Sequence, residues 1–131
     1  MIQLLARNGF LAAALLLAAG GRAAHAGPAL VQLIAKAEPG SVVKVAAGVH
    51  HGALRIDKPL TLVGEPGAIV DGDGTGDVIR IAASNVVVRN LTIRDSGTSL
   101  TQMNAGIFVE QRARDVVIAG NRLEQVLVQR G

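Results

Sequence analysis

Three short segments of the sequence carry the same apolar pattern at nearly constant spacing, and this repeat limits the fold more than any other feature. The segments PLTLVG, NVVVRN and DVVIAG occupy residues 59–64, 85–90 and 115–120, so they recur after 26 and 30 residues. Apolar side chains alternate along each segment, as they do on the buried face of a β-strand. Each segment ends in a residue type that tolerates a positive φ, namely Gly64, Asn90 and Gly120.

Two further ladders of apolar positions keep step with the first. One joins Leu54, Ile79 and Ile107, and the other joins Ile69, Ile93 and Leu123. Three strand positions in each repeat of 24–30 residues predict coils with one strand on each side of a triangular prism, and stacked coils bury a continuous core. We therefore expect an all-β fold, a right-handed parallel β-helix of about three coils plus a partial fourth. A small sandwich of parallel strands is the alternative, and two independent ladders of similar spacing argue against it.

Aromatic residues are nearly missing, which agrees with a core of stacked aliphatic side chains. Phe10 and Phe108 are the only two, and the chain has no Trp, Tyr or Cys. β-Branched residues pack well along such ladders. Without cysteine, the stability of the domain has to come from packing alone.

The first 26 residues have the three parts of a secretory signal peptide. Arg7 precedes an apolar run over residues 9–20, and small residues flank His25 at the end. The run is short for a membrane span, although an anchor or a buried helix is the alternative. We expect cleavage after Ala26, export to the periplasm and no membrane span after signal removal.

Signal removal also changes the charge of the chain. It leaves 11 basic residues against 10 acidic ones, because Arg7 and Arg22 are lost from the original 13. The aromatic platforms on which bases stack are missing as well, so no nucleic-acid partner is expected.

Residues 27–40 are expected to form an N-terminal capping helix, followed by the coils over residues 41–131. One helical face carries Leu30, Leu33, Ile34 and Ala37, and Pro39 with Gly40 ends the helix. Such a helix would lie across the first coil and cover an edge that otherwise invites aggregation.

The stretch DGDGTGD, residues 71–77, is the densest group of carboxylates. Its counterpart one repeat later is residues 95–104, with Asp71 and Asp95 as equivalent corners. The spacing imitates a calcium loop, but Ala82 stands where the bidentate Glu is needed. No base or sugar-stacking aromatic lies near in sequence, so the stretch is interpreted as a bend between strands.

No catalytic or cofactor-binding residue is predicted, and the metal-site candidates are weak. They are His50, His51 and Met103, the only remaining histidines and soft donor after signal removal. Adjacent residues of a strand point to opposite faces, so both histidines reach one ion only if the chain turns there, as Gly48 and Gly52 suggest. Surface histidines at a coil corner are the simpler interpretation.

Two strings, IDKPLTLVGEPGAIVDGDGTGDVIRI and VVVRNLTIRDSGTSLTQMNAGIFVE, resemble the amino-terminal coils of the NosD family. The similarity runs from PGSVVKVAAGVHHG through GNRLEQ and covers most of the chain after the signal. The resemblance implies a periplasmic β-helix protein that acts with ABC transporter subunits and supports assembly of the copper–sulfur centre of nitrous oxide reductase. It also implies an association with copper, and it brings no catalytic residues, so the protein is not expected to be an enzyme.

NosD proteins have many more coils, so the chain is expected to be a truncated form whose last coil exposes an apolar edge. A polysaccharide-binding or polysaccharide-modifying β-helix, such as a lyase or epimerase, is the alternative function, and it predicts aromatics and a basic–acidic cluster along one groove. A structural, adhesin-like passenger is a third function, and it predicts many further similar repeats.

Overall fold

The computed structural model describes residues 29–126, and the expected signal peptide lies outside this range. One helix, α1 (Leu30–Lys36), precedes the strands. The first coil contains β1 (Val42–Val45), β2 (Gly48–His51) and β3 (Leu54–Ile56), and the second contains β4 (Leu60–Gly64), β5 (Ala68–Asp71) and β6 (Ile79–Ile81). The third contains β7 (Val86–Arg89), β8 (Thr92–Arg94) and β9 (Ile107–Val109), and the fourth contains β10 (Val117–Ala119) and β11 (Arg122–Glu124).

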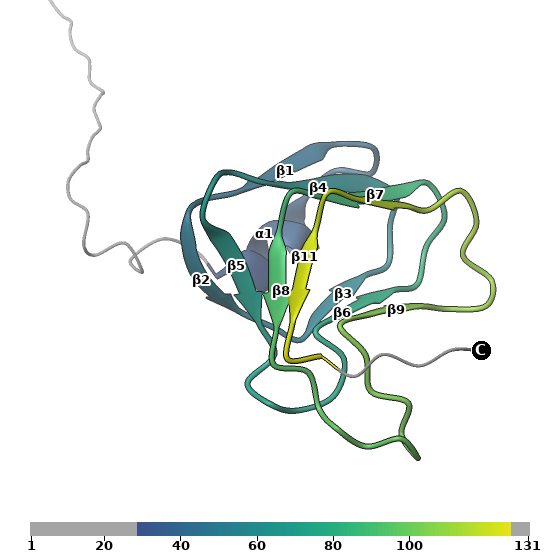
Figure 1. The fold of residues 1–131 in the computed structure, drawn as a ribbon. Helices are drawn as coiled ribbons and strands as arrows, with labels where there is room; N and C mark the ends of the chain where they lie inside the picture. The colour runs from purple at the N-terminus through teal and green to yellow at the C-terminus, as the bar shows by residue number, and fades with distance from the viewer. Residues whose placement is uncertain (1–28, 127–131) are drawn as a thin grey trace, which may run out of the picture.

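The strands form three parallel sheets, one on each side of a triangular prism (Figure 1). The sheet orders are β1-β4-β7-β10, β2-β5-β8-β11 and β3-β6-β9, so each strand pairs with the equivalent strand of the next coil. This arrangement is the right-handed parallel β-helix that the repeat predicts.

Two of the three predicted ladders are confirmed by the strand register. In the first sheet Leu60 pairs with Val86, and in the third sheet Leu54, Ile79 and Ile107 stand in one row. All of these side chains except Ile107 are at most 1% exposed.

The prediction for the second sheet was wrong by one residue. Val70, not Ile69, stands in the row with Ile93 and Leu123. The turn between β4 and β5 is longer than the turn between β7 and β8, and Ile69 and Val70 are both apolar, so the spacing from the preceding turn residue did not distinguish them. The same shift places Asp71 opposite Arg94, which corrects the expected equivalence of Asp71 and Asp95.

Helix α1 covers the first coil as expected, where it contacts β1 and β3. Leu30 and Ile34 are each 2% exposed and belong to the core. Leu33 was expected on the same buried face but is 39% exposed. Around the helix axis, Leu33 lies about 60° from Leu30 and about 100° from Ile34. It is therefore at the edge of the buried face and not at its centre.

The three turn residues of the first ladder serve two different needs. Asn90 and Gly120 have φ values of 61° and 65°, as their residue types predict. Gly64 is required for another reason, since a Cβ there would lie 2.2 Å from the carbonyl oxygen of Asn90 in the next coil. Close approach of two stacked coils, and not a positive φ, accounts for this glycine.

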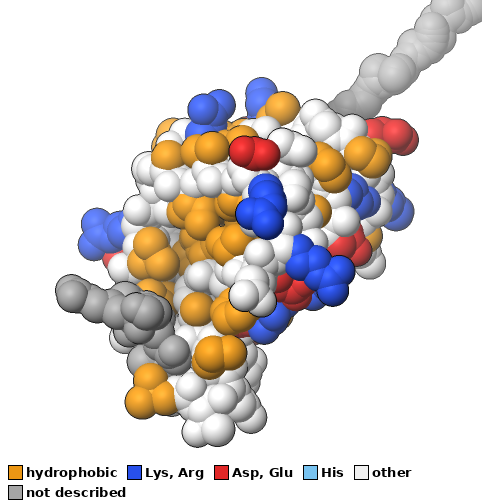
Figure 2. Space-filling view, turned by 90° about the vertical axis from the view of Figure 1, so that its right-hand side faces the viewer, with side chains coloured by type: hydrophobic (Ala, Val, Ile, Leu, Met, Phe, Trp, Pro, Cys, Tyr) orange, Lys and Arg blue, Asp and Glu red, His pale blue; other side chains and the backbone are white. Residues whose placement is uncertain are grey.

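Apolar side chains are exposed at the fourth coil, which no further described strand covers. Val117, Ile118 and Leu123 are 50%, 43% and 46% exposed. On the face that contains the loop between β9 and β10, hydrophobic side chains gather in a hollow beside a group of basic and acidic ones (Figure 2). Within residues 29–126, no helix is both long and apolar enough to cross a membrane.

Candidate functional site: a polar corner at the ends of β2, β5 and β8

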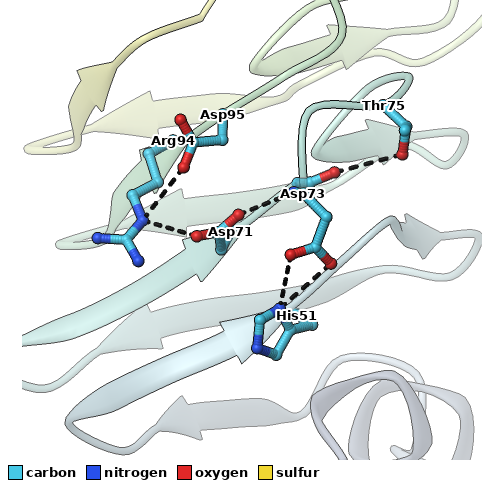
Figure 3. Close-up of polar contacts among 7 residues, drawn as sticks. His51, Asp71, Asp73, Thr75, Arg94 and Asp95 are labelled. Carbon is cyan, nitrogen blue, oxygen red and sulfur yellow. Dashed lines mark hydrogen bonds and ion pairs between the residues drawn. The ribbon is translucent and has the colours of Figure 1, made fainter.

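A row of polar side chains crosses the second sheet where its strands end. Register pairs join His51 to Asp71, Asp71 to Arg94, and Arg94 to Glu124. The parallel stacking of coils therefore brings together residues that are 20 to 30 positions apart in sequence. Figure 3 shows how the first three of these side chains meet, together with Asp73 and Asp95.

Asp71 is the buried centre of this corner, at 7% exposed. One carboxylate oxygen accepts a hydrogen bond of 2.8 Å from the backbone N–H of Asp73, and the other accepts one of 2.8 Å from Nε of Arg94. The Asp73 N–H and then the Arg94 guanidinium hold the pKa of the Asp71 carboxyl below its ordinary value, against the opposing effect of burial. Asp71 is therefore a permanently ionised structural carboxylate at neutral pH.

Asp73 completes the corner from the loop that follows β5. Its φ of 55° is left-handed, and the Asp71 carboxylate stabilises that conformation through the N–H bond. Nδ1 of His51 lies 2.9 Å and 3.2 Å from the two carboxylate oxygens of Asp73 (Figure 3). Both side chains are more than half exposed, so this pair contributes little to stability.

The carboxylate-rich stretch begins at Asp71, the last residue of β5, and its other residues lie in the turn between β5 and β6. Hydrogen bonds connect this turn to the next coil. Gly74 donates a backbone hydrogen bond to the carbonyl of Asp95, and Gly97 donates one to Gly76, each 2.8 Å long. At its far end, Asp77 accepts a 2.9 Å hydrogen bond from the N–H of Ala105. The stacked loops are thus ordered by cross-coil bonds.

His51, Asp71 and Asp73 form the one group of potential metal ligands among the described residues, with one ligand atom from each lying within 4.8 Å of the others. One imidazole and two carboxylates suit a divalent ion such as Zn²⁺ better than a soft cuprous ion. Asp71 is already bound to Arg94, whose charge opposes a cation at this place.

Of the three candidate metal ligands from the sequence, the two histidines contact different groups. Nε2 of His50 lies 2.7 Å from the carbonyl of Ala46, while His51 faces Asp73 from the same strand. Met103 lies on the loop between β8 and β9 and is 53% exposed. Within residues 29–126, no described interaction joins Met103 to either histidine.

The arginines of the third sheet are ion-paired. Arg55 and Arg80 occupy paired positions, and one NH1 nitrogen of each lies 3.2 Å and 3.3 Å from the same oxygen of Glu110. Arg80 also pairs with Asp77 at 2.8 Å and stacks 4.3 Å from the ring centre of Phe108. Arg80 and Arg55 lower the pKa of the Glu110 carboxyl by hydrogen bonding. These ion pairs connect adjacent coils, so the two arginines are not free basic groups on the surface.

The sequence interpretation missed the contacts that make up the polar corner. The contact between Asp71 and Arg94 could have been found in the sequence. Each residue directly follows a buried apolar residue, Val70 or Ile93, so the two occupy equivalent positions in adjacent coils. The contact of Asp73 with His51 was harder to find, because it requires the register of two coils and a left-handed residue in the loop.

Fold and site together define a right-handed parallel β-helix whose described polar clusters bind one coil to the next. A solved pectin methylesterase structure, a mutant in complex with a hexasaccharide, has a similar fold with a TM-score of 0.52 and 19% identity. The match covers 73% of this chain and 43% of that one. At this identity the likeness concerns the fold and says nothing of a substrate.

Sequence relatives identify the family, although no family model matches the chain. A Pseudomonas aeruginosa protein named "Probable ABC transporter binding protein NosD" is 36% identical over 97 residues, which make up 74% of this chain and 88% of that protein. The chain therefore belongs to the NosD family. Two others of the same name, from P. aeruginosa and Stutzerimonas stutzeri, are 39% and 30% identical over 60% and 86% of this chain. The matches span only 18% and 26% of those two proteins.

Proposed function

We propose that this chain is an exported accessory protein that binds an ABC transporter in the periplasm. We propose further that it supports maturation of the copper–sulfur centre of nitrous oxide reductase. The observation that carries the proposal is membership of the NosD family, whose relatives are named as transporter binding proteins.

The proposed mode of action is binding without catalysis. A general acid or base at neutral pH needs a pKa near 7. The described carboxylates with shifted pKa values, Asp71 and Glu110, are moved the other way by arginine and backbone partners. Both carboxylates are committed to bonds between coils, which supports a structural role for them.

The polar corner does not fit a cuprous ion. Thiolate and thioether are the ligands that Cu(I) prefers, whereas the corner offers an imidazole and two carboxylates. The proposal therefore assigns the described coils to protein contacts, and no copper-transfer step is assigned to their residues.

The proposal is tested in the host organism by deleting the gene and measuring the copper content and activity of nitrous oxide reductase. We expect both to fall in the deletion strain and to recover when the full chain is supplied from a plasmid. A strain that supplies the chain without its first 26 residues is the matched control for export. Unchanged copper content after deletion would refute the maturation role.

A further inference from the structure

A shallow apolar groove lies at the N-terminal end of the stack, between α1 and β1. It has a volume of about 340 Å³, and its lining includes Leu33, Ala37, Val42, Val43, Lys36 and Lys44. Val42 is 59% exposed and Leu33 is 39% exposed, so apolar side chains of both elements face outward here.

One edge of β1 is paired with no other described strand, although α1 contacts β1. β1 is the terminal strand of its sheet. The carbonyls of Ser41 and Val45 accept hydrogen bonds of 2.9 Å from Thr61 and Glu65 in the second coil. Because parallel strands use alternate residues for each neighbour, the N–H and C=O groups of Val42 and Lys44 point away from β4.

The side chains of β1 alternate between the two sides of the strand, and two lysines lie close to its unpaired edge. Val43 and Val45 turn toward the core and α1, whereas Val42 and Lys44 turn outward. Lys36 adds a second ammonium group from the last turn of α1. Within residues 29–126, neither lysine takes part in an ion pair, so both charges are available to a partner.

We propose that β1 binds an extended segment of a partner protein in which apolar and acidic residues alternate. Such a segment would add a strand to the sheet through the outward backbone groups of Val42 and Lys44. Successive side chains of a strand point to opposite faces, so one set would enter the apolar groove beside α1. The other set would lie beside Lys44, where carboxylates are favoured.

Charge distinguishes this occupant from two others. Residues 1–28 of the chain contain no Asp or Glu, so they cannot complement Lys36 and Lys44. A second copy joined by two-fold symmetry would place β1 against β1, so both copies would bring Lys36 and Lys44 to one interface. The sequence of β1, VVKV, supplies no carboxylate to neutralise them.

The test uses the full chain and a short fluorescein-labelled peptide in which Val and Glu alternate, with binding followed by fluorescence polarisation. We expect saturable binding that weakens as salt is added, and none with the matching Val–Lys peptide. The double variant Lys36→Glu, Lys44→Glu should lose about tenfold or more in affinity. The control variant Arg112→Glu, Arg114→Glu makes the same charge change at exposed positions between β9 and β10 and should bind as the original chain does.

A second pair of variants tests the strand edge itself. Val42→Pro removes an N–H that points away from β4, and proline is tolerated on such an edge. Val42→Thr keeps the N–H. We expect Val42→Pro to melt as Val42→Thr does but to lose peptide binding. Equal binding by the two variants, or equal binding by both charge-reversal variants, would overturn the proposal. So would self-association abolished by Val42→Pro, which would identify a second copy as the occupant.

Discussion

Replacing Gly64 by alanine adds one atom at a point where the second and third coils are in close contact, and so tests how tightly the coils stack. The new Cβ would lie 2.2 Å from the carbonyl oxygen of Asn90 and 2.8 Å from Cδ2 of Leu91. Real Cβ contacts stay beyond 3.0 Å, so the second and third coils must separate by about 0.8 Å at this point. The obstructing oxygen belongs to the backbone and cannot rotate away, which places the cost near the upper end of the overpacking range, about 3 kcal/mol.

Part of that cost is offset in the unfolded chain. Alanine reduces the conformational freedom of the unfolded state, and this stabilises a protein by about 0.4–1 kcal/mol. The net loss in the free energy of unfolding should therefore be about 2 kcal/mol, which corresponds to a melting temperature lower by roughly 10 °C. Urea unfolding followed by circular dichroism measures this free energy directly.

Gly67→Ala is the matched control, because its Cβ would meet only the Cβ of Ala47 at 3.6 Å. Its φ of 87° is unfavourable for alanine, so this variant should lose about 1 kcal/mol or less after the same offset. If Gly64→Ala were no less stable than Gly67→Ala, the close contact between the coils would not exist as described.

Four further substitutions separate the core, the polar corner and the surface. Ile81→Ala empties a fully buried position and should cost about 3 kcal/mol in urea unfolding, whereas Leu33→Ala should cost less than about 1 kcal/mol because Leu33 is partly exposed; equal losses would contradict the described core. Asp71→Asn should cost about 2 kcal/mol at pH 7 by breaking the charged hydrogen bond with Arg94. Because folding lowers the pKa of Asp71, its contribution to stability is complete above the ordinary pKa of 3.8 and is lost as the pH falls through the lower folded value. The difference in stability between the two proteins should therefore shrink in acid, and a difference that grows there would refute the sign. His51→Ala should change stability by less than about 0.5 kcal/mol in the same assay, and a larger loss would show that the exposed pair with Asp73 is more than a surface contact.

The fold could be predicted from the sequence because the coils repeat one simple requirement. Every inward-facing position of the first sheet needs an aliphatic residue. Leu62 and Val88 are such a pair, and each stands two residues before its turn residue, Gly64 or Asn90. The second sheet was placed one residue out because three residues, 65–67, separate β4 from β5, whereas two residues, 90–91, separate β7 from β8. A period-two pattern cannot reveal such a slip when Ile69 and Val70 are both apolar.

The polar corner depended on that same register. Once Val70 is aligned with Ile93, Asp71 falls opposite Arg94, and the pairing of opposite charges follows from the sequence. The contact between His51 and Asp73 also needs the left-handed conformation of Asp73, which the hydrogen bond to Asp71 stabilises. A backbone conformation fixed by a neighbouring side chain could not be inferred before the register was known.

The most direct test of the proposed function is the binding of the purified full chain to the purified ABC transporter proposed as its partner, in detergent, measured by biolayer interferometry. We expect saturable binding, which weakens in the double variant Lys36→Glu, Lys44→Glu if the transporter supplies the acidic strand and is unaffected if another protein supplies it. Absence of saturable binding by the original chain would contradict the claim that this β-helix is a transporter-binding protein.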